Sequence, residues 1–465
     1  MTETAPGLRH TSLVAVLPLA AVALAALVLA PAPIAIIGAL ALAVAIGLAP
    51  WMAASLVVLT LPYYLHPRSF GGIELSLTEA TILLSVAGVL GRAIAERFIT
   101  PRAPGPFPVG RQLTPAFRFP APSPADWAAA AMLAAALLSL LVTEYPRQSL
   151  RELRWLIVEP LLLFYVARAT LSEAYHVRLV LWSVVASGAI AALVALFSLV
   201  MQGAVLSVAD RAANPYLSPN HLGLFLGRAG AVALALALFA PPRAKRASVV
   251  GLAAILSALL RTLSLGAWAG FGATAVALTA LRGRRCLAAT VISLLIVFLV
   301  GVVALPAGRT SGRLDPNTGT ALFRLQIWSS SLRMIADHPV LGIGLDNFLY
   351  QYRGGYMLPE AADEPNISHP HNWVLNFWLE LGLLGLVSAL GILMWVARTA
   401  WRFVRWPIEA DDRLVGGAAI GVFVDTLVHG SLDNSYFLVD AAVVWWLFVA
   451  LLIVVSQRRA APPNR

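Results

Sequence analysis

The sequence predicts an all-α, polytopic integral membrane protein with about 12–14 transmembrane helices and one large external loop containing short helices. The first observation is composition: 59% of the 465 residues are hydrophobic and only 12% are charged, whereas a soluble domain carries about 25% charged residues. The second is that apolar runs of span length recur along the chain. The third is one long polar interruption in the C-terminal half, which begins at Arg309 and ends where Trp373 opens another apolar run.

The apolar runs follow one another with short polar connections. They fall roughly at 12–30, 33–48, 51–65, 75–95, 126–143, 153–170, 177–201, 219–240, 247–263, 266–281, 286–305, 373–397, 413–431 and 437–456. A span needs about 20 apolar residues, so the short, Pro-broken early runs either merge or lie re-entrant. The first run looks like a signal peptide, but Pro31 and Pro33 lead directly into the next run, which favours a retained span.

Clusters of basic residues in short loops predict the orientation, because such loops stay in the cytoplasm. An even number of runs separates successive clusters, so all can lie on one side with both termini. The clusters are Arg92/Arg97/Arg102, Arg168/Arg178, Arg243/Lys245/Arg246, Arg282/Arg284/Arg285, Arg398/Arg402/Arg405 and Arg458/Arg459. The remaining connections are then external, including 202–218, the turn near 261–265, 306–372 and 429–436.

Five regions follow from this pattern. They are N-terminal transmembrane helices at 1–96, a Pro- and Arg-rich cytoplasmic linker at 97–125, a transmembrane core at 126–305, the large external loop at 306–372 and C-terminal transmembrane helices at 373–465. The single Cys286 excludes an intrachain disulfide, so packing and polar contacts must hold the external loops.

Basic residues also occur on the predicted external side, against the usual bias. The net charge of +10 could suggest a nucleic-acid partner, but the position of the arginines in membrane loops argues for no nucleic acid. Arg211, Arg261 and Arg324 lie in these external segments. A guanidinium binds phosphate bidentately and stays charged, so an anionic ligand such as a diphosphate is the physical interpretation.

The large loop contains a predicted surface helix and a turn. From Arg324 to Asp337, Leu325, Trp328, Leu332 and Ile335 are spaced for one apolar face. This pattern is typical of a helix lying on the bilayer, in contact with membrane lipids and with Trp328 at the level of their headgroups. Pro339 is expected to end the helix, and Gly342 and Gly344 are expected to form the turn after it.

The loop ends in the sequence His369-Pro370-His371-Asn372. Such a pair of histidines can cap a helix, bind a metal or act as an acid–base group. A metal is disfavoured, because no further His, Cys or acidic grouping with ligand-like spacing accompanies the pair on that side. Catalysis remains, since a neutral imidazole accepts a proton near physiological pH. Asn372 is expected to be the N-cap of the next helix.

Three other arginines have both ordinary and functional interpretations. Arg261 can be a residue at a helix end with its guanidinium reaching the interface, and Arg211 precedes an ordinary Pro-started helix entry. Arg228 lies inside a predicted span, where a charge is normally partnered. A structural ion pair with Glu159 or Asp425 is favoured for Arg228 over a substrate contact.

Together these residues resemble the O-antigen ligase and O-antigen polymerase family of bacterial membrane glycosyltransferases. The resemblance covers roughly 211–386 and depends on the order of Arg324-x-x-x-Trp328, a Pro339-x-x-Gly342-x-Gly344 turn and His369-Pro370-His371-Asn372. The segment 263–268, LSLGAW, looks like the family's Ser-Arg-Gly-Ala-Trp segment. Leu265 stands where the family usually has arginine, and Arg261, one helical turn earlier, is the candidate for its role.

The resemblance implies an inverting glycan transfer with no metal and no cofactor, at the external face of the bacterial cytoplasmic membrane. The donor would be an undecaprenyl-diphosphate-linked glycan, and the acceptor a lipid A–core sugar or another lipid-linked glycan. His371 would be the general base supported by His369, while Arg324, Arg261 and Arg211 would bind diphosphate. The alternative is a transporter or flippase of lipid-linked or anionic envelope precursors. Ligase or polymerase activity and the oligomeric state stay open.

Overall fold

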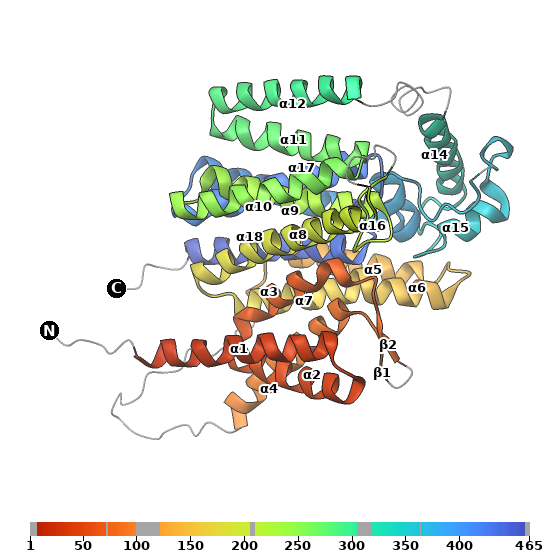
Figure 1. Cartoon of the computed structure of the whole chain (residues 1–465). Helices are drawn as coiled ribbons and strands as arrows, with labels where there is room; N and C mark the ends of the chain where they lie inside the picture. Colours follow the sequence, from red (N-terminus) through yellow and green to blue (C-terminus); the bar gives the residue numbers. More distant parts are fainter. Residues whose placement is uncertain are drawn as a thin grey trace. The chain divides into compact units, whose positions relative to one another are not determined.

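The structure is a computed structural model that describes residues 7–70, 73–98, 121–204, 210–304, 319–362 and 364–460. It is helical apart from one small hairpin (Figure 1). The α-helices are α1 (Gly7–Leu29), α2 (Ala32–Leu48), α3 (Ala53–Thr60), α4 (Leu77–Phe98), α5 (Pro124–Ser139), α6 (Pro146–Glu152), α7 (Glu159–Thr170), α8 (Ala174–Met201), α9 (Pro219–Phe239), α10 (Pro242–Arg261), α11 (Leu265–Arg282), α12 (Arg284–Ala304), α14 (Gly319–Asp337), α15 (Phe348–Gln351), α16 (Trp373–Arg405), α17 (Ala410–Gly430) and α18 (Val439–Ala460). Short turns of 3-10 helix are η1 (Pro50–Met52), η2 (Leu61–Tyr63) and η5 (Pro359–Ala361), and π-helical turns are η3 (Leu153–Val158) and η4 (Tyr352–Tyr356).

The all-helical, polytopic membrane fold is confirmed. Among the described residues, six helices are long and apolar enough to cross a membrane, or up to seven if the bent pair 32–63 is one span. The six are α4, α8, α9, α16, α17 and α18. The number is below the 12–14 expected from apolar runs because several runs form shorter helices, such as the 16-residue α5, and others carry charges, such as α10 with its basic first turn.

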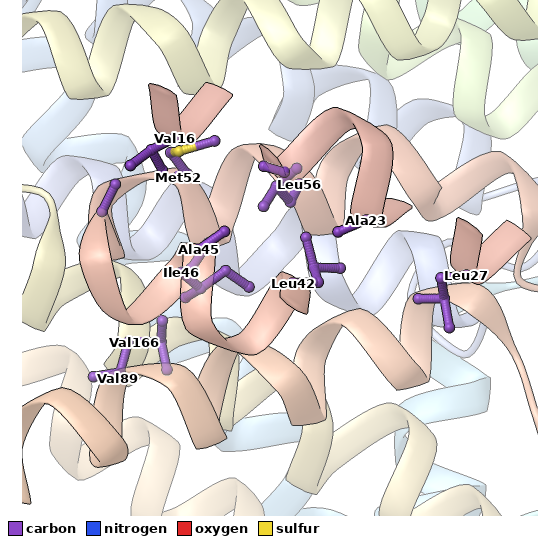
Figure 2. Packing of buried hydrophobic residues seen from close by; sticks show 13 residues of the cluster. Val16, Ala23, Leu27, Leu42, Ala45, Ile46, Met52, Leu56, Val89 and Val166 are labelled. Atoms are coloured by element: carbon purple, nitrogen blue, oxygen red, sulfur yellow. The ribbon is translucent and has the colours of Figure 1, made fainter. Parts of the chain in front are cut away.

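The chain divides into two compact units, of which the first comprises 1–121 and 162–183. Its core is a cluster of small and branched apolar side chains, with Leu42, Ala45 and Ile46 of α2 at the centre (Figure 2). Val16 of α1 and Val89 of α4 close the cluster from two other helices. The antiparallel strands β1 (Arg68–Phe70) and β2 (Ile73–Leu75) lie between η2 and α4 in the chain. Most of the predicted linker 97–125 lies outside the described residues.

The second unit comprises 122–161 and 184–465 and is built around α9, α11 and α17, which pack on one another. Small residues permit the close approach. A Cβ added to Gly227 of α9 or to Gly270 of α11 would lie within 2.5 or 2.6 Å of an Asp425 carboxylate oxygen on α17. Close helix approach through small residues is typical of membrane bundles. The most enclosed span is α18, in which 94% of the apolar window is buried.

Helix α16 is broken at Gly382, and the turn after α14 docks on this break. Gly382 has φ 68° and Gly342 has φ 70°, both in the left-handed region that favours glycine. Across the break, Ile343 N donates to Leu379 O at 2.7 Å and Leu383 N donates to Val340 O at 2.9 Å. The predicted turn at Gly342 is therefore confirmed. A Cβ on Gly342 would lie 2.2 Å from Leu379 O, so the turn packs directly against the backbone of α16.

The other side of this turn is clamped to the connection between α5 and α6. The side-chain nitrogen of Asn347 donates to Thr143 Oγ1 at 2.8 Å and to Ser149 Oγ at 2.9 Å. Ser149 Oγ in turn donates to Leu345 O at 2.6 Å. Gly344 has φ 92° and faces Ser139 O and Thr143. The turn therefore fixes α14 to two other parts of the second unit.

Helix α14 begins before the predicted residue Arg324 and ends before Pro339 as expected. Its predicted apolar face is partly exposed on the protein surface and partly buried, with Ile335 among the buried residues. Leu325 and Leu332 are 47% and 58% exposed, whereas Ile327 and Met334 are buried against Phe348, Tyr352 and Leu379. Helical periodicity alone could not choose this face, because the aromatic residues that cover it lie in a later segment.

Candidate active site

A cavity of about 120 Å³ lies where four segments of the second unit meet. The segments are the loop leading into α9, the start of α11, the start of α14 and the connection between α17 and α18. Its lining residues are Arg211, Asn220, Leu263, Ser264, Leu265, Gly266, Thr320, Arg324, Leu432 and Asp433. Two predicted arginines, Arg211 and Arg324, are thus brought together on one polar cavity.

Arg211 is fixed in direction by two hydrogen bonds. Its Nε donates to Thr262 O at 2.7 Å, and one terminal nitrogen donates to Asn220 Oδ1 at 2.9 Å. Asn220 stands in the first turn of α9, whose N-cap Ser218 accepts from Asn220 N. These bonds hold the guanidinium on the cavity wall, which lowers the entropy lost when it binds a ligand.

The start of α11 forms a second part of the wall. Ser264 is the N-cap, and its hydroxyl accepts from Ala267 N. Leu263 before it has φ 49°, a left-handed conformation that is uncommon for a leucine. Leu265 and Gly266 are the first two helical residues and line the cavity. The amide groups and positive dipole end of an 18-residue helix favour an anion there.

Arg261, the third predicted arginine, is not among the cavity-lining residues. A terminal nitrogen donates to Ala204 O at 3.0 Å and to Asp210 O at 3.3 Å. Its backbone oxygen accepts from Ala212 N at 2.9 Å. Arg261 therefore contacts the residues on both sides of Arg211 and holds that loop to the end of α10.

His369 and His371 meet a carboxylate from another part of the chain. His369 Nε2 and His371 Nδ1 each lie 3.2 Å from the same oxygen, Oδ1 of Asp433. The two imidazole centroids are 4.2 Å apart. Asp433 is 4% exposed and also lines the cavity, so this one carboxylate joins the histidine pair to the arginines.

The partners of the cluster define which ring nitrogens carry protons. Asp433 Oδ1 also accepts from Asn434 N at 2.8 Å, and because an ionised carboxylate only accepts, both histidine nitrogens facing it donate. For His371 this places the proton on Nδ1 and leaves Nε2 as the acceptor. For His369 it places the proton on Nε2, with Nδ1 accepting from the Ser368 hydroxyl at 3.0 Å.

Charges in the cluster shift two pKa values. Burial raises the pKa of Asp433, but the hydrogen bonds and charges of His369 and His371 outweigh it and hold the pKa well below its usual range. Burial, followed by the neighbouring His371, lowers the pKa of His369, while Asp433 opposes the shift. The cluster thus pairs an ionised Asp433 with a neutral His369 near pH 7.

The segment carrying the histidines is held from both sides. Trp328 Nε1 donates to Pro370 O at 3.0 Å, between the two histidines. Asn372 is the N-cap of α16 as predicted, because its Oδ1 accepts from Val374 N and Leu375 N. His371 between them has φ 52°. Left-handed conformations of non-glycine residues cost about 1–2 kcal/mol and concentrate at functional sites.

Sequence reasoning missed Asp433. It lies 62 residues after His371 in the sequence, so no local spacing joins the two. The available signal was an acidic residue in the short connection 429–436, which the alternation of spans assigns to the same side as the histidines.

Asp433 also supplies a possible third metal ligand beside the two histidines. The ligand atoms of His369, His371 and Asp433 lie within 4.8 Å of one another, a spacing that can hold a metal ion. The histidines therefore have a possible third ligand, contrary to the prediction from the sequence. Metal independence of the reaction stays a prediction.

Fold and site together define a multi-pass helical membrane protein with an arginine-lined cavity beside a histidine–aspartate cluster. Residues 250–390 match the O-antigen ligase family, so the chain carries a domain of that family. A protein of Pseudomonas aeruginosa named O-antigen ligase is 34% identical over 110 residues, covering 22% of this chain. The match spans about a quarter of that relative, 24% of its length.

Proposed function

We propose that the protein is an inverting, metal-independent glycosyltransferase of the bacterial cytoplasmic membrane. It moves a glycan from an undecaprenyl-diphosphate carrier to an acceptor hydroxyl at the external face. The observation that carries the proposal is the position of Asp433, which lines the arginine-bearing cavity and accepts from both His369 and His371. The family match over residues 250–390 supports a lipid-linked glycan as donor.

His371 is the general base of the proposed reaction. Its Nδ1 faces Asp433, so Nε2 takes the proton of the acceptor hydroxyl. The hydroxyl oxygen forms a bond to the anomeric carbon from the face opposite the diphosphate. The old bond from that carbon to the diphosphate oxygen breaks, its electron pair stays on the diphosphate, and the configuration inverts. Asp433 stabilises the imidazolium that forms.

Arg211, Arg324 and the first amides of α11 bind the diphosphate in this proposal. Positive groups aimed at a leaving group stabilise its developing charge without reorganising. Arg261 supports them by holding the loop on either side of Arg211. The backbone amides of Leu265 and Gly266 offer donors where the family's arginine side chain is missing.

Transfer by the purified protein in lipid nanodiscs tests the proposal. A fluorescent undecaprenyl-diphosphate oligosaccharide and an acceptor glycolipid should give a product with an inverted linkage, also in the presence of a chelator. His371→Ala should abolish product formation while the protein stays folded. His338→Ala is the matched control, because His338 is an exposed histidine of the same loop and should leave the rate unchanged.

The same assay separates the alternatives. Movement of the lipid-linked glycan across a proteoliposome membrane without a glycosidic product would identify a flippase and overturn the proposal. Supplying lipid A–core in one reaction and a second lipid-linked glycan in another separates ligase from polymerase activity by the product formed.

A further inference from the structure

Arg228 is a fully enclosed cation in the interior of the second unit. It stands on α9 and is 1% exposed. An arginine inside a membrane span is costly unless it is partnered, and such residues usually have a function. It does not line the described cavity, so the proposed reaction has not yet used it.

The guanidinium joins three elements. Its Nε donates to Thr426 Oγ1 of α17 at 3.2 Å, and a terminal nitrogen donates to Ser435 O at 2.5 Å. Asp425 and Asp440 are its acidic electrostatic partners, and both are buried. Among the described contacts the Asp425 oxygens have no hydrogen-bond partner, so their interaction with Arg228 is electrostatic. Of the two expected partners, Asp425 is therefore the relevant one.

Ser435 lies in the connection that carries Asp433. The middle of this connection is buried: Asp433, Asn434, Ser435 and Tyr436 are each at most 6% exposed. Tyr436 donates to Leu156 O at 2.9 Å, and Asn434 Nδ2 donates to Phe437 O at 2.9 Å. These bonds hold the later part of the connection. The bond from Arg228 holds the backbone carbonyl of Ser435, two residues after Asp433.

We infer that Arg228 is a positioning residue for the histidine–aspartate cluster: by holding Ser435 O, it sets the place of Asp433 beside His369 and His371. This inference rests on the proposed function and extends it into the interior of the bundle. The guanidinium is suited to this positioning, because one planar group with several N–H donors bonds Thr426 and Ser435 at the same time. The carboxylate of Asp425 offsets the positive charge of the buried Arg228 side chain.

The test compares variants that keep the buried charge balanced. Arg228→Met combined with Asp425→Asn removes both charges, whereas either change alone would leave an unpaired buried charge. Arg228→Lys keeps the charge but loses the planar group, and Thr426→Val removes one partner at similar size. Arg168→Met is the matched control, because Arg168 is a buried arginine of the first unit, 6% exposed, whose terminal nitrogen donates to Ala121 O of the same unit.

We expect kcat of the double variant to fall by about tenfold or more, since misplacing a catalytic group by about 1 Å can cost 100-fold. The KM for the lipid-linked donor should not change, because Arg211 and Arg324 remain. Arg228→Lys should recover much of the rate, and Thr426→Val should fall between Arg228→Lys and the wild type. Arg168→Met should leave kcat per folded molecule unchanged.

A second readout does not depend on activity. Nitrogen-15 NMR of labelled histidine should show His371 protonated at Nδ1 in the wild type, and this signature should be lost in the double variant and kept in Arg168→Met. Wild-type kcat or an unchanged His371 signature in the double variant would overturn the inference. If wild-type protein makes no glycosidic product, the proposed function fails, and the NMR signature still decides the role of Arg228. Should the double variant not fold, a wild-type kcat together with an unchanged His371 signature in both Arg228→Lys and Thr426→Val would overturn the inference.

Discussion

The indole Nε1 of Trp328 donates a hydrogen bond to the carbonyl oxygen of Pro370 at 3.0 Å. Trp328 lies one helical turn after Arg324 on α14, and Pro370 separates the two histidines of the cluster. One helix therefore presents a cavity-lining arginine and holds the histidine segment at the same time. In the proposed reaction, α14 couples the site of the leaving group to the site of the base.

Trp328→Phe should lower kcat by about fivefold, because a net hydrogen bond contributes about 1 kcal/mol and the aromatic packing is kept. The donor KM should not change. Trp127→Phe is the control, since Trp127 is 80% exposed on α5. Equal rates in Trp328→Phe and wild type, measured with the purified proteins, would contradict the positioning role.

Asp433→Asn should lower kcat by about 100-fold or more, as loss of the carboxylate in a histidine–aspartate pair does elsewhere. The amide can donate as well as accept, so it permits the tautomer of His371 that has no base at Nε2. Rates and nitrogen-15 shifts of His371 measured on the same samples should change together. A variant with a lost rate and an unchanged tautomer would argue against this explanation.

Arg211→Gln and Arg324→Gln should each weaken pyrophosphate binding by about tenfold, since charge-assisted hydrogen bonds contribute about 1.5–3 kcal/mol. Arg261→Gln should have a smaller effect on affinity and a larger one on thermal stability, because its donors hold Ala204 and Asp210. Isothermal titration with inorganic pyrophosphate measures the affinities. If Arg261→Gln weakens binding most of the three, Arg261 contacts the anion directly.

Gly342→Ala and Gly382→Ala should each destabilise the protein by at least about 2 kcal/mol, since left-handed backbone alone costs 1–2 kcal/mol for alanine. The added Cβ would also lie 2.2 Å from Leu379 O or 2.3 Å from Val340 O. Gly354→Ala is the control, because no atom lies within 4 Å of its added Cβ. Thermal unfolding in detergent should rank the three variants in this way, and equal melting temperatures would refute the backbone crossing.

A pH effect is expected at Glu152, which lies beside the Arg151–Asp346 ion pair of 2.6 Å. Burial and then Asp346 raise the pKa of Glu152 from 4.5 to about 8, while Arg151 opposes the shift. Glu380 of α16 is a further acidic neighbour. The folded protein holds the proton more tightly than the unfolded chain. The stability that the protonated Glu152 side chain contributes is therefore complete below pH 4.5 and is lost as the pH rises through about 8.

Glu152→Gln should therefore flatten the dependence of melting temperature on pH between about 4.5 and 8, because the amide cannot ionise. Glu144→Gln serves as the control, since Glu144 is exposed at the same end of the second unit. A slope that is the same in Glu152→Gln and wild type would show that other groups set the pH response.

Features set by neighbours in the sequence were predictable. The N-cap Asn372, the helix end before Pro339 and the turn at Gly342 follow from residues within a few positions of one another, and all three are found. Composition likewise indicated a helical membrane protein. The order of Arg324, Trp328 and the histidines indicated the family.

Features set by distant contacts were not predictable. Asp433 reaches His371 only because α16 and α17 return the chain to the same end of the second unit. The left-handed break at Gly382 has no local signal apart from the glycine itself, and it depends on the turn that docks there. The buried face of α14 depends on Phe348 and Tyr352. Each of these features is decided by tertiary packing, and the periodicity of the sequence carries no information about which distant residues will pack together.

The size of the cavity bears on substrate choice. Its volume of about 120 Å³ is well below the 300–1,000 Å³ of pockets that enclose a drug-sized ligand. A diphosphate group fits such a volume, while an oligosaccharide does not. In the proposed reaction the cavity thus binds the diphosphate, which all the lipid-linked donors share, and the sugars lie outside it. Preference for one repeat unit over another would then arise on the surrounding surface, and the same centre could serve envelopes with different glycans.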